Sequence, residues 1–103
     1  MKQNKIDEAE IFYKKELQLN YNDPDANLIV GVITFKKGDL DGAVQYFINA
    51  SKYNPDDRQP YLYLLKIYYQ KKNFPEALKY AELLKSKNVK VPDDIARDIG
   101  FEQ

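Results

Sequence analysis

The sequence repeats a short pattern of residue types at a fixed spacing of 34 positions, the period of the repeat. In "KKGDLDGAVQYF", polar residues lead into Leu40, and Ala43 follows three residues later. The stretch "QKKNFPEALKYA" keeps this order, with Phe74 and Ala77 each one period further along. The stretch "NKIDEAEIFY" gives a third occurrence, one period before the first. Three occurrences at one period predict a chain of stacked units, each burying its apolar face against a neighbour.

The composition is that of a small globular protein. Of the 103 residues, 44% are hydrophobic and 31% are charged, which is ordinary for a chain with a packed core. There is no cysteine, which excludes a disulfide framework and zinc–thiolate sites. The longest apolar run, "LIVGVITF", is much shorter than the ~20 residues of a membrane helix. Because the first residues are polar and acidic, unlike a signal peptide, we expect a cytoplasmic protein without membrane contact.

Apolar residues three and four positions apart predict helices along the whole chain. Asp23, Asp39 or Asp41, and Asn73 suit helix N-caps, and Gly38 suits a helix C-terminus. The acids of "NPDD" and "PDD" are likewise interpreted as caps. The expected helices cover about residues 6–19, 25–37, the stretch after Asp39 or Asp41 to residue 53, 60–71, the stretch from Pro75 to "SKNVKVP", and a short 93–101.

One stretch argues against a helix. "LIVGVITF" is continuous and β-branched, and in isolation it has the composition of a buried strand. The matching stretch one period later, "LYLLKIYY", favours a helix much more strongly. The repeat therefore predicts a helix in both places.

These features resemble the tetratricopeptide repeat, a helix–turn–helix unit with the same period. The copy at residues 24–57 carries the pattern best, with Val30, Gly31, Gly38-Asp39-Leu40, Ala43, Phe47, Ala50 and Pro55 in place. The resemblance implies an all-α fold, a right-handed solenoid of antiparallel helix hairpins, with about five helices and a short C-terminal helix. Small residues such as Gly31 and Ala43 would let the two helices approach, while Phe47 fills the gap between them.

The domain organisation follows from the repeat. We expect one domain over residues 1–103, with a second helix alone in 1–23, repeats at 24–57 and 58–91, and a capping or truncated helix at 92–103. The copy at 58–91 departs from the pattern at Leu65, where a small residue is usual, and at Ala81, where an aromatic is usual. Bulk from Leu65 and Leu84 is expected to fill the space that Ala81 leaves. Ile6, Phe12 and Ile95 are expected to leave exposed apolar ends.

Catalysis and metal binding have no support in the sequence. Without histidine or cysteine, His-based acid–base chemistry, Ser-His-Asp triads and His/Cys metal sites are excluded. "DPDAN" has the alternating acids of a calcium loop, but Leu28 stands where that loop needs glycine and Thr34 where it needs glutamate. We therefore expect no enzyme activity, no cofactor and no metal.

The copy at residues 58–91 is strongly basic. From residue 58 to 90, eight basic residues face two acidic ones, whereas residues 1–57 and 92–103 are net acidic. Tyrosines between these lysines could stack on nucleic-acid bases. However, Tyr61 and Tyr68 fall on the expected packing stripe, and most of the lysines lie at helix C-termini, where the dipole favours them. Nucleic-acid binding is the less favoured hypothesis.

A second apolar stripe points to a protein partner. If Asn27, Val30, Gly31 and Thr34 face their own hairpin, Leu28, Val32 and Phe35 must face elsewhere. By resemblance to the family, this stripe and its counterpart one period later line a concave groove in which peptides or partner helices lie. The predicted groove residues are Asp25, Leu28, Val32, Phe35, Lys36, Gln59, Leu62, Lys66, Tyr69 and Gln70. Family members that bind the C-terminal carboxylate of heat-shock chaperones use basic and asparagine side chains in this groove. Among the matching positions only Lys66 is basic, so we do not expect carboxylate binding of this kind.

The sequence therefore predicts a protein–protein interaction scaffold that binds a peptide or partner helix in an apolar groove. Leaving Leu28, Val32 and Phe35 in water forgoes roughly 1.5–3 kcal/mol each, so a cover is expected. A partner segment, a second copy of the chain in a homodimer, or further repeats would each supply it. The alternative is accordingly a self-associating structural segment or a piece of a longer solenoid.

Overall fold

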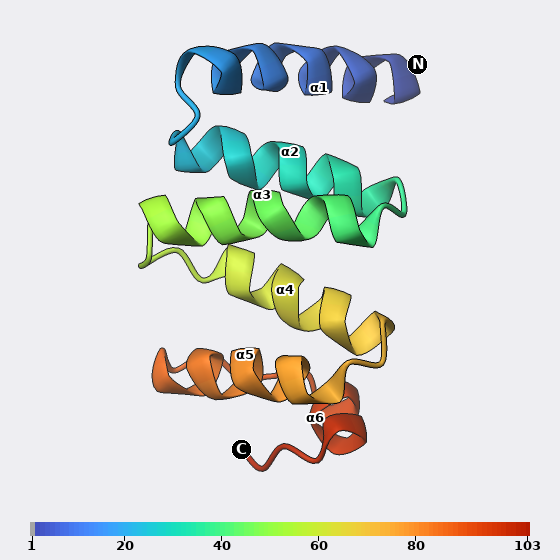
Figure 1. The fold of residues 1–103 in the computed structure, drawn as a ribbon. Helices are drawn as coiled ribbons and strands as arrows, with labels where there is room; N and C mark the ends of the chain where they lie inside the picture. The colour runs from blue at the N-terminus through green and yellow to red at the C-terminus, as the bar shows by residue number, and fades with distance from the viewer. Residues whose placement is uncertain (1) are drawn as a thin grey trace. The chain divides into compact units, whose positions relative to one another are not determined.

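The computed structural model describes residues 2–103 and is helical throughout, with no strand in that range (Figure 1). The helices are α1 Lys2–Leu19, α2 Pro24–Lys36, α3 Leu40–Tyr53, α4 Gln59–Gln70, α5 Phe74–Ser86 and α6 Asp93–Ile99. The expected all-α class, with five helices and a short C-terminal helix, is confirmed. "LIVGVITF" lies wholly within α2, so the helix predicted from the repeat is correct and the strand is not.

The predicted signals for the ends of α2 act as expected. The Asp23 carboxylate accepts hydrogen bonds from the backbone N–H groups of Asp25, at 3.0 Å, and Ala26, at 3.3 Å. Pro24 follows at the first helical position, where its missing N–H removes no helical bond. Gly38 ends the turn after α2 with a φ of +90°, a conformation that glycine adopts without a steric penalty.

Side chains cap two of the other helices. Asp39 accepts from the Gly42 N–H at 2.9 Å, and Asn73 accepts from the Glu76 N–H at 3.5 Å. The caps predicted in "NPDD" and "PDD" are wrong, because the N-cap residues of α4 and α6 are Arg58 and Pro92, and neither makes a side-chain capping bond. In α4 a proline in the first turn leaves one donor fewer to satisfy.

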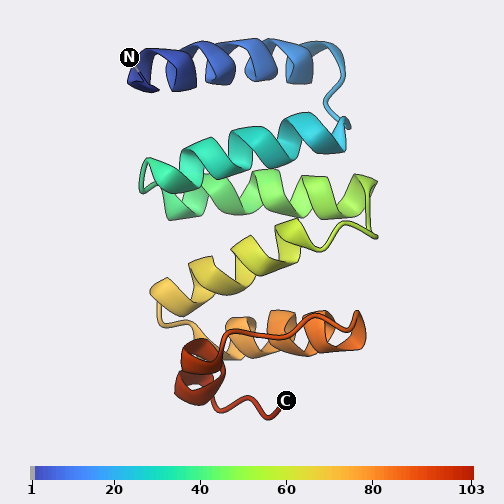
Figure 2. The ribbon, with the colours of Figure 1, turned by 180° about the vertical axis from the view of Figure 1, so that it is seen from behind.

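The chain divides into two compact units, Met1–Asp57 and Arg58–Gln103. In the first unit, α1 lies alongside α2, and α2 and α3 form an antiparallel hairpin (Figure 1 and, from behind, Figure 2). The centre of this hairpin is closely packed. A Cβ atom added at Gly31 would lie 2.9 Å from a ring carbon of Phe47, and Phe47 is itself fully buried. The close packing predicted for Gly31 and Phe47 is therefore confirmed, and a side chain at residue 31 would require the Phe47 ring to move.

The Asn27 side chain holds the turn that precedes this hairpin. It is 1% exposed, and its side-chain amide donates to the backbone carbonyls of Tyr21, at 3.0 Å, and Asp23, at 2.9 Å. A buried amide costs free energy unless it is bonded, and here both donors are satisfied. The turn before α2 is therefore held against the helix from inside.

In the second unit, α4 and α5 form the hairpin and α6 crosses the N-terminal end of α5 (Figure 1, Figure 2). Its core contains Leu65, Ala77, Ala81, Leu84, Val91, Ile95, Ala96 and Ile99. The prediction that Ile95 leaves an exposed end is wrong, because α6 folds back and buries it to 7% exposure. The helix also stops at Ile99, before the expected residue 101, since Gly100 turns the chain with a φ of +76°.

In the second hairpin the large residue of the central packing pair lies on the first helix and the small residue on the second, the reverse of the first hairpin. Leu65 and Ala81 occupy the positions one period after Gly31 and Phe47. Both are fully buried in one cluster with Leu84. A large residue on the first helix thus replaces the large residue on the second, a substitution that conserves volume, as cores tolerate.

This packing predicts that Gly31→Ala has opposite effects in two backgrounds. In the wild type the new methyl group meets the Phe47 ring, so we expect a loss of about 1–3 kcal/mol in the free energy of unfolding. In Phe47→Leu the ring is gone, and we expect a gain of about 0.5–1 kcal/mol from the higher helix propensity of alanine. Urea unfolding followed by circular dichroism measures both.

Leu84→Ala is the matched control background, because Leu84 is equally buried but belongs to the other unit. There, Gly31→Ala is expected to remain as destabilising as in the wild type, since distant sites add independently. The same loss in all three backgrounds would show that the Phe47 ring does not limit residue 31.

Candidate functional site

The predicted stripe on α2 occupies the side of the helix opposite its hairpin contact. Val30, Gly31 and Thr34 are buried, as are Ala26, Asn27 and Ile33. Leu28, Val32 and Phe35 are only partly buried, while Asp25 and Lys36 at the two ends are exposed. α2 is therefore apolar on both sides, with one side fully packed and the other partly accessible.

A small cleft beside this stripe involves α1. It has a volume of about 190 Å³ and is lined by Ile6, Val32, Ile33, Lys36 and Lys37. Ile6 is 39% exposed, so the expectation of an exposed apolar residue is confirmed there. Sequence reasoning had not placed Ile6 beside the stripe, although the repeat marks it as a counterpart of Leu40.

The matching stripe on α4 lies in the second unit. Leu62 and Tyr69 are partly buried, and both pack against the core of that unit. Gln59, Lys66 and Gln70 are exposed. The stripe thus offers a mixture of apolar surface, amides and one ammonium group.

Tyr69 and Gln70 also line a pocket of about 460 Å³ at the C-terminal end of α4. Its other walls are Lys72, Phe74 and Asp98. The Tyr69 and Phe74 rings are stacked, with centroids 6.4 Å apart. The Tyr69 hydroxyl donates a hydrogen bond to the Asp98 carboxylate, and this bond raises the pKa of Tyr69 above its ordinary value. No local pattern pairs two residues 29 positions apart, so sequence reasoning missed Asp98.

The tyrosines of the basic copy are partly covered by the protein itself. Tyr61 and Tyr68 pack against the core of the second unit, as their place on the stripe predicts. Lys87 lies over the Tyr61 ring at 5.3 Å, and Lys66 lies over Tyr63 at 5.5 Å. Other side chains of the protein thus cover part of each of these rings.

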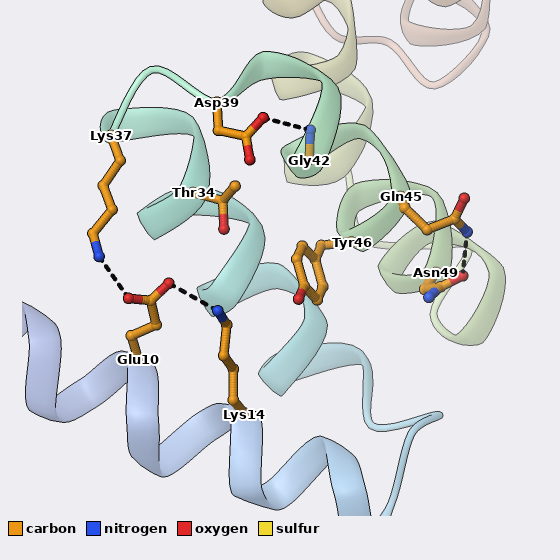
Figure 3. Close-up of a pocket in the computed structure, with 9 residues that line it drawn as sticks. All are labelled: Glu10, Lys14, Thr34, Lys37, Asp39, Gly42, Gln45, Tyr46 and Asn49. Atoms are coloured by element: carbon orange, nitrogen blue, oxygen red, sulfur yellow. Dashed lines mark hydrogen bonds and ion pairs between the residues drawn. The ribbon is translucent and has the colours of Figure 1, made fainter.

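A third pocket, of about 460 Å³, lies in the first unit and is lined mostly by residues with polar side chains (Figure 3). It is lined by Glu10, Lys14, Thr34, Lys37, Asp39, Gly42, Gln45, Tyr46 and Asn49. Lys37 donates to Glu10 at 2.6 Å, and Lys14 pairs with the other carboxylate oxygen at 3.3 Å. On the opposite wall, the Gln45 amide donates to Asn49 at 3.0 Å. The ion pair of Glu10 with Lys37 therefore joins α1 to the residue that follows α2.

The comparisons with known proteins agree with this architecture. The tetratricopeptide repeat family matches residues 34–96, which is more than half of the chain. The chain belongs to the tetratricopeptide repeat family. No curated protein matches it. Tetratricopeptide repeats generally mediate protein–protein interactions, and the matched segment contains the end of α2 together with α3, α4 and α5.

Two further observations concern the part of the chain that the structure describes. Among residues 2–103, no helix is long and apolar enough to cross a membrane. In the same range, no three histidine, cysteine, aspartate or glutamate residues are grouped so that they could hold a metal ion. The surface features described for this tetratricopeptide repeat protein are apolar stripes, an aromatic pocket and an ion-pair network.

The ion pair between α1 and α2 predicts how stability depends on pH. The hydrogen bond from Lys37 holds the pKa of Glu10 below its ordinary value of 4.5. A carboxyl group with a lowered pKa stabilises the fold above its unfolded-state pKa, and loses this effect as the pH falls through the folded-state value. Glu10→Gln is therefore expected to destabilise the protein at neutral pH. The difference from the wild type should begin to shrink as the pH falls towards 4.5 and should disappear only below the lowered folded-state pKa of Glu10.

Thermal unfolding between acid and neutral pH measures this difference. The effect is expected to be smaller than that of a core substitution, because exposed ion pairs contribute little. Glu82→Gln, which removes an exposed glutamate from α5, is the control for the change in net charge. A difference between Glu10→Gln and the wild type that stays constant across this pH range would contradict the assignment.

Proposed function

We propose that the chain is an interaction module that binds a peptide or a partner helix along the apolar stripe of α2, and that the matching stripe of α4 is a contact surface of the second unit. The observation that carries this proposal is the double-sided apolar character of α2. One side packs against α3 in the hairpin, while Leu28, Val32 and Phe35 on the other side keep part of their surface accessible. A helix that is apolar on both sides is stable in water when both sides are covered.

The energetics favour a bound segment on this stripe. Apolar surface removed from water stabilises a complex by about 25 cal/mol per Å². The stripe lies on the rigid half of a packed hairpin, so little conformational entropy is lost when a partner docks. An amphipathic helix with apolar residues three and four positions apart matches such a surface, because its own stripe has the same spacing.

The polar residues at the edges supply orientation. Asp25 begins the α2 stripe and Lys36 ends it, and both are exposed. On α4, Gln59 and Gln70 take the corresponding ends, with Lys66 between them. Amide and charged groups at the rim of an apolar contact select the direction and register of the bound segment. Within the second unit, the pocket beside Tyr69 has room for one large apolar side chain against the two stacked rings.

We further propose that α6 acts as a cap on the repeat at residues 58–91. Ile95, Ala96 and Ile99 cover the core of the second unit, while the acids of α6 face outward. Capping helices with a polar outer face keep repeat proteins soluble. The repeat boundaries at residues 24–57 and 58–91 belong to the same proposal.

A random peptide library panned against the full chain tests the binding surface. We expect enriched peptides with apolar residues at helical spacing, and Leu28→Ser/Phe35→Ser should weaken their binding by at least about tenfold. The expectation follows because removing two partly buried apolar contacts costs about 1.5–3 kcal/mol or more. Fluorescence anisotropy with labelled selected peptides measures the dissociation constants.

Leu19→Ser is the matched control, because Leu19 is an exposed apolar residue on α1, outside both stripes. Its affinity for the selected peptides should equal that of the wild type. Circular dichroism confirms that each variant is folded. Peptides that bind Leu28→Ser/Phe35→Ser and the wild type equally well would exclude the α2 stripe as the binding surface.

A further inference from the structure

The side of α1 that faces away from α2 exposes three large apolar residues. Ile11 is 57% exposed, Phe12 is 65% exposed and Leu19 is 89% exposed. The exposed end that the sequence predicted at Phe12 is therefore confirmed. Glu8 and Lys15 lie on the same side and are also exposed. The Phe12 and Tyr13 rings meet edge to face, with their centroids 5.1 Å apart, and Phe12 remains exposed.

The repeat shows which residues of this surface have polar counterparts in the later copies. One period after Ile11 the chain has Gln45, and two periods after it the chain has Lys79. Two periods after Leu19 stands Lys87. The counterparts of Phe12 are Tyr46 and Tyr80, and Tyr53 stands one period after Leu19, so the position of Ile11 is the one that loses its apolar or aromatic character in both later copies. Contiguous exposed apolar residues on a small protein mark a contact surface.

The charged residues are placed symmetrically about the apolar pair. Glu8 comes three residues before Ile11, and Lys15 comes three residues after Phe12. All four share one side of the helix, because residues three, four and seven positions apart lie above one another. The α1 face, defined as Glu8, Ile11, Phe12, Lys15 and Leu19, therefore has a negative end, an apolar centre and a positive end followed by Leu19.

We propose that the α1 face packs antiparallel on the α1 face of a second copy of the chain, forming a two-fold dimer. With the axis between Ile11 and Phe12, Glu8 faces the partner subunit's Lys15, and Lys15 faces the partner subunit's Glu8. Ile11 meets the partner subunit's Phe12, so the apolar centres cover each other. A parallel pair would place Glu8 against Glu8 and Lys15 against Lys15, so the charge pattern selects the antiparallel arrangement.

The size and symmetry of this contact define the expected assembly. An isologous contact uses the same patch on both copies and closes after two, so dimers form rather than chains. One helix face per copy is a small interface, which predicts dissociation constants in the micromolar range or weaker. This proposal does not depend on peptide binding by α2 or α4.

Sedimentation equilibrium of the full chain over a wide concentration range tests the proposal. The wild type should dimerise, and Ile11→Ser/Phe12→Ser should be monomeric at every concentration. Glu8→Lys and Lys15→Glu should each weaken the dimer about tenfold, because each single change opposes like charges at both symmetric pairs. The double variant Glu8→Lys/Lys15→Glu restores opposite charges and should return the affinity to near the wild-type value.

Glu82→Lys, a charge reversal at an exposed position of α5, is the control and should leave the dimer unchanged. Circular dichroism verifies that each variant keeps its helices. A wild type that is monomeric throughout would overturn the proposal, as would a dimer that survives Ile11→Ser/Phe12→Ser. A dimer weakened by Leu28→Ser/Phe35→Ser instead would place the contact on the α2 stripe, and failure of the double charge variant to recover would exclude the antiparallel register.

Discussion

The close approach of α2 to α3 at Gly31 and Phe47 is the contact on which the arrangement of the first unit depends. It fixes the rotation of α2 about its own axis, because only the side that carries Gly31 can take the ring. Because that side faces α3, the 3.6-residue periodicity of the helix places Leu28, Val32 and Phe35 on the other side. The accessible stripe is therefore a consequence of how the hairpin packs.

The second unit reaches an equivalent hairpin by a different distribution of volume. Leu65 on α4 and Ala81 on α5 fill the space with the large residue on the opposite helix. What the repeat conserves along the chain is thus total volume and apolar character at paired positions, rather than a particular residue. The unit adds α6, whose buried Ile95 and Ile99 extend the core beyond the hairpin.

Much of the fold could be predicted from the sequence, because its determinants are local or periodic. The caps at Asp23 and Asp39 and the left-handed Gly38 each act within a few residues, and the repeat period corrected the strand-like composition of "LIVGVITF". The long-range pairings escaped prediction. The bonds from Tyr69 to Asp98 and from Lys37 to Glu10 join residues 29 and 27 positions apart, and no spacing rule marks them.

The two proposed surfaces of the first unit lie on different helices and have different physical character. The stripe on α2 is a continuous apolar row with polar ends, which suits an asymmetric partner whose direction the ends select. The α1 face carries opposite charges on either side of its apolar centre, a pattern that is complementary to itself when reversed. Because α1 presents this face on the side away from α2, covering it removes no surface from the stripe. A dimer formed in this way presents two binding modules at once, and a partner that carries two matching segments gains avidity wherever both can be engaged together.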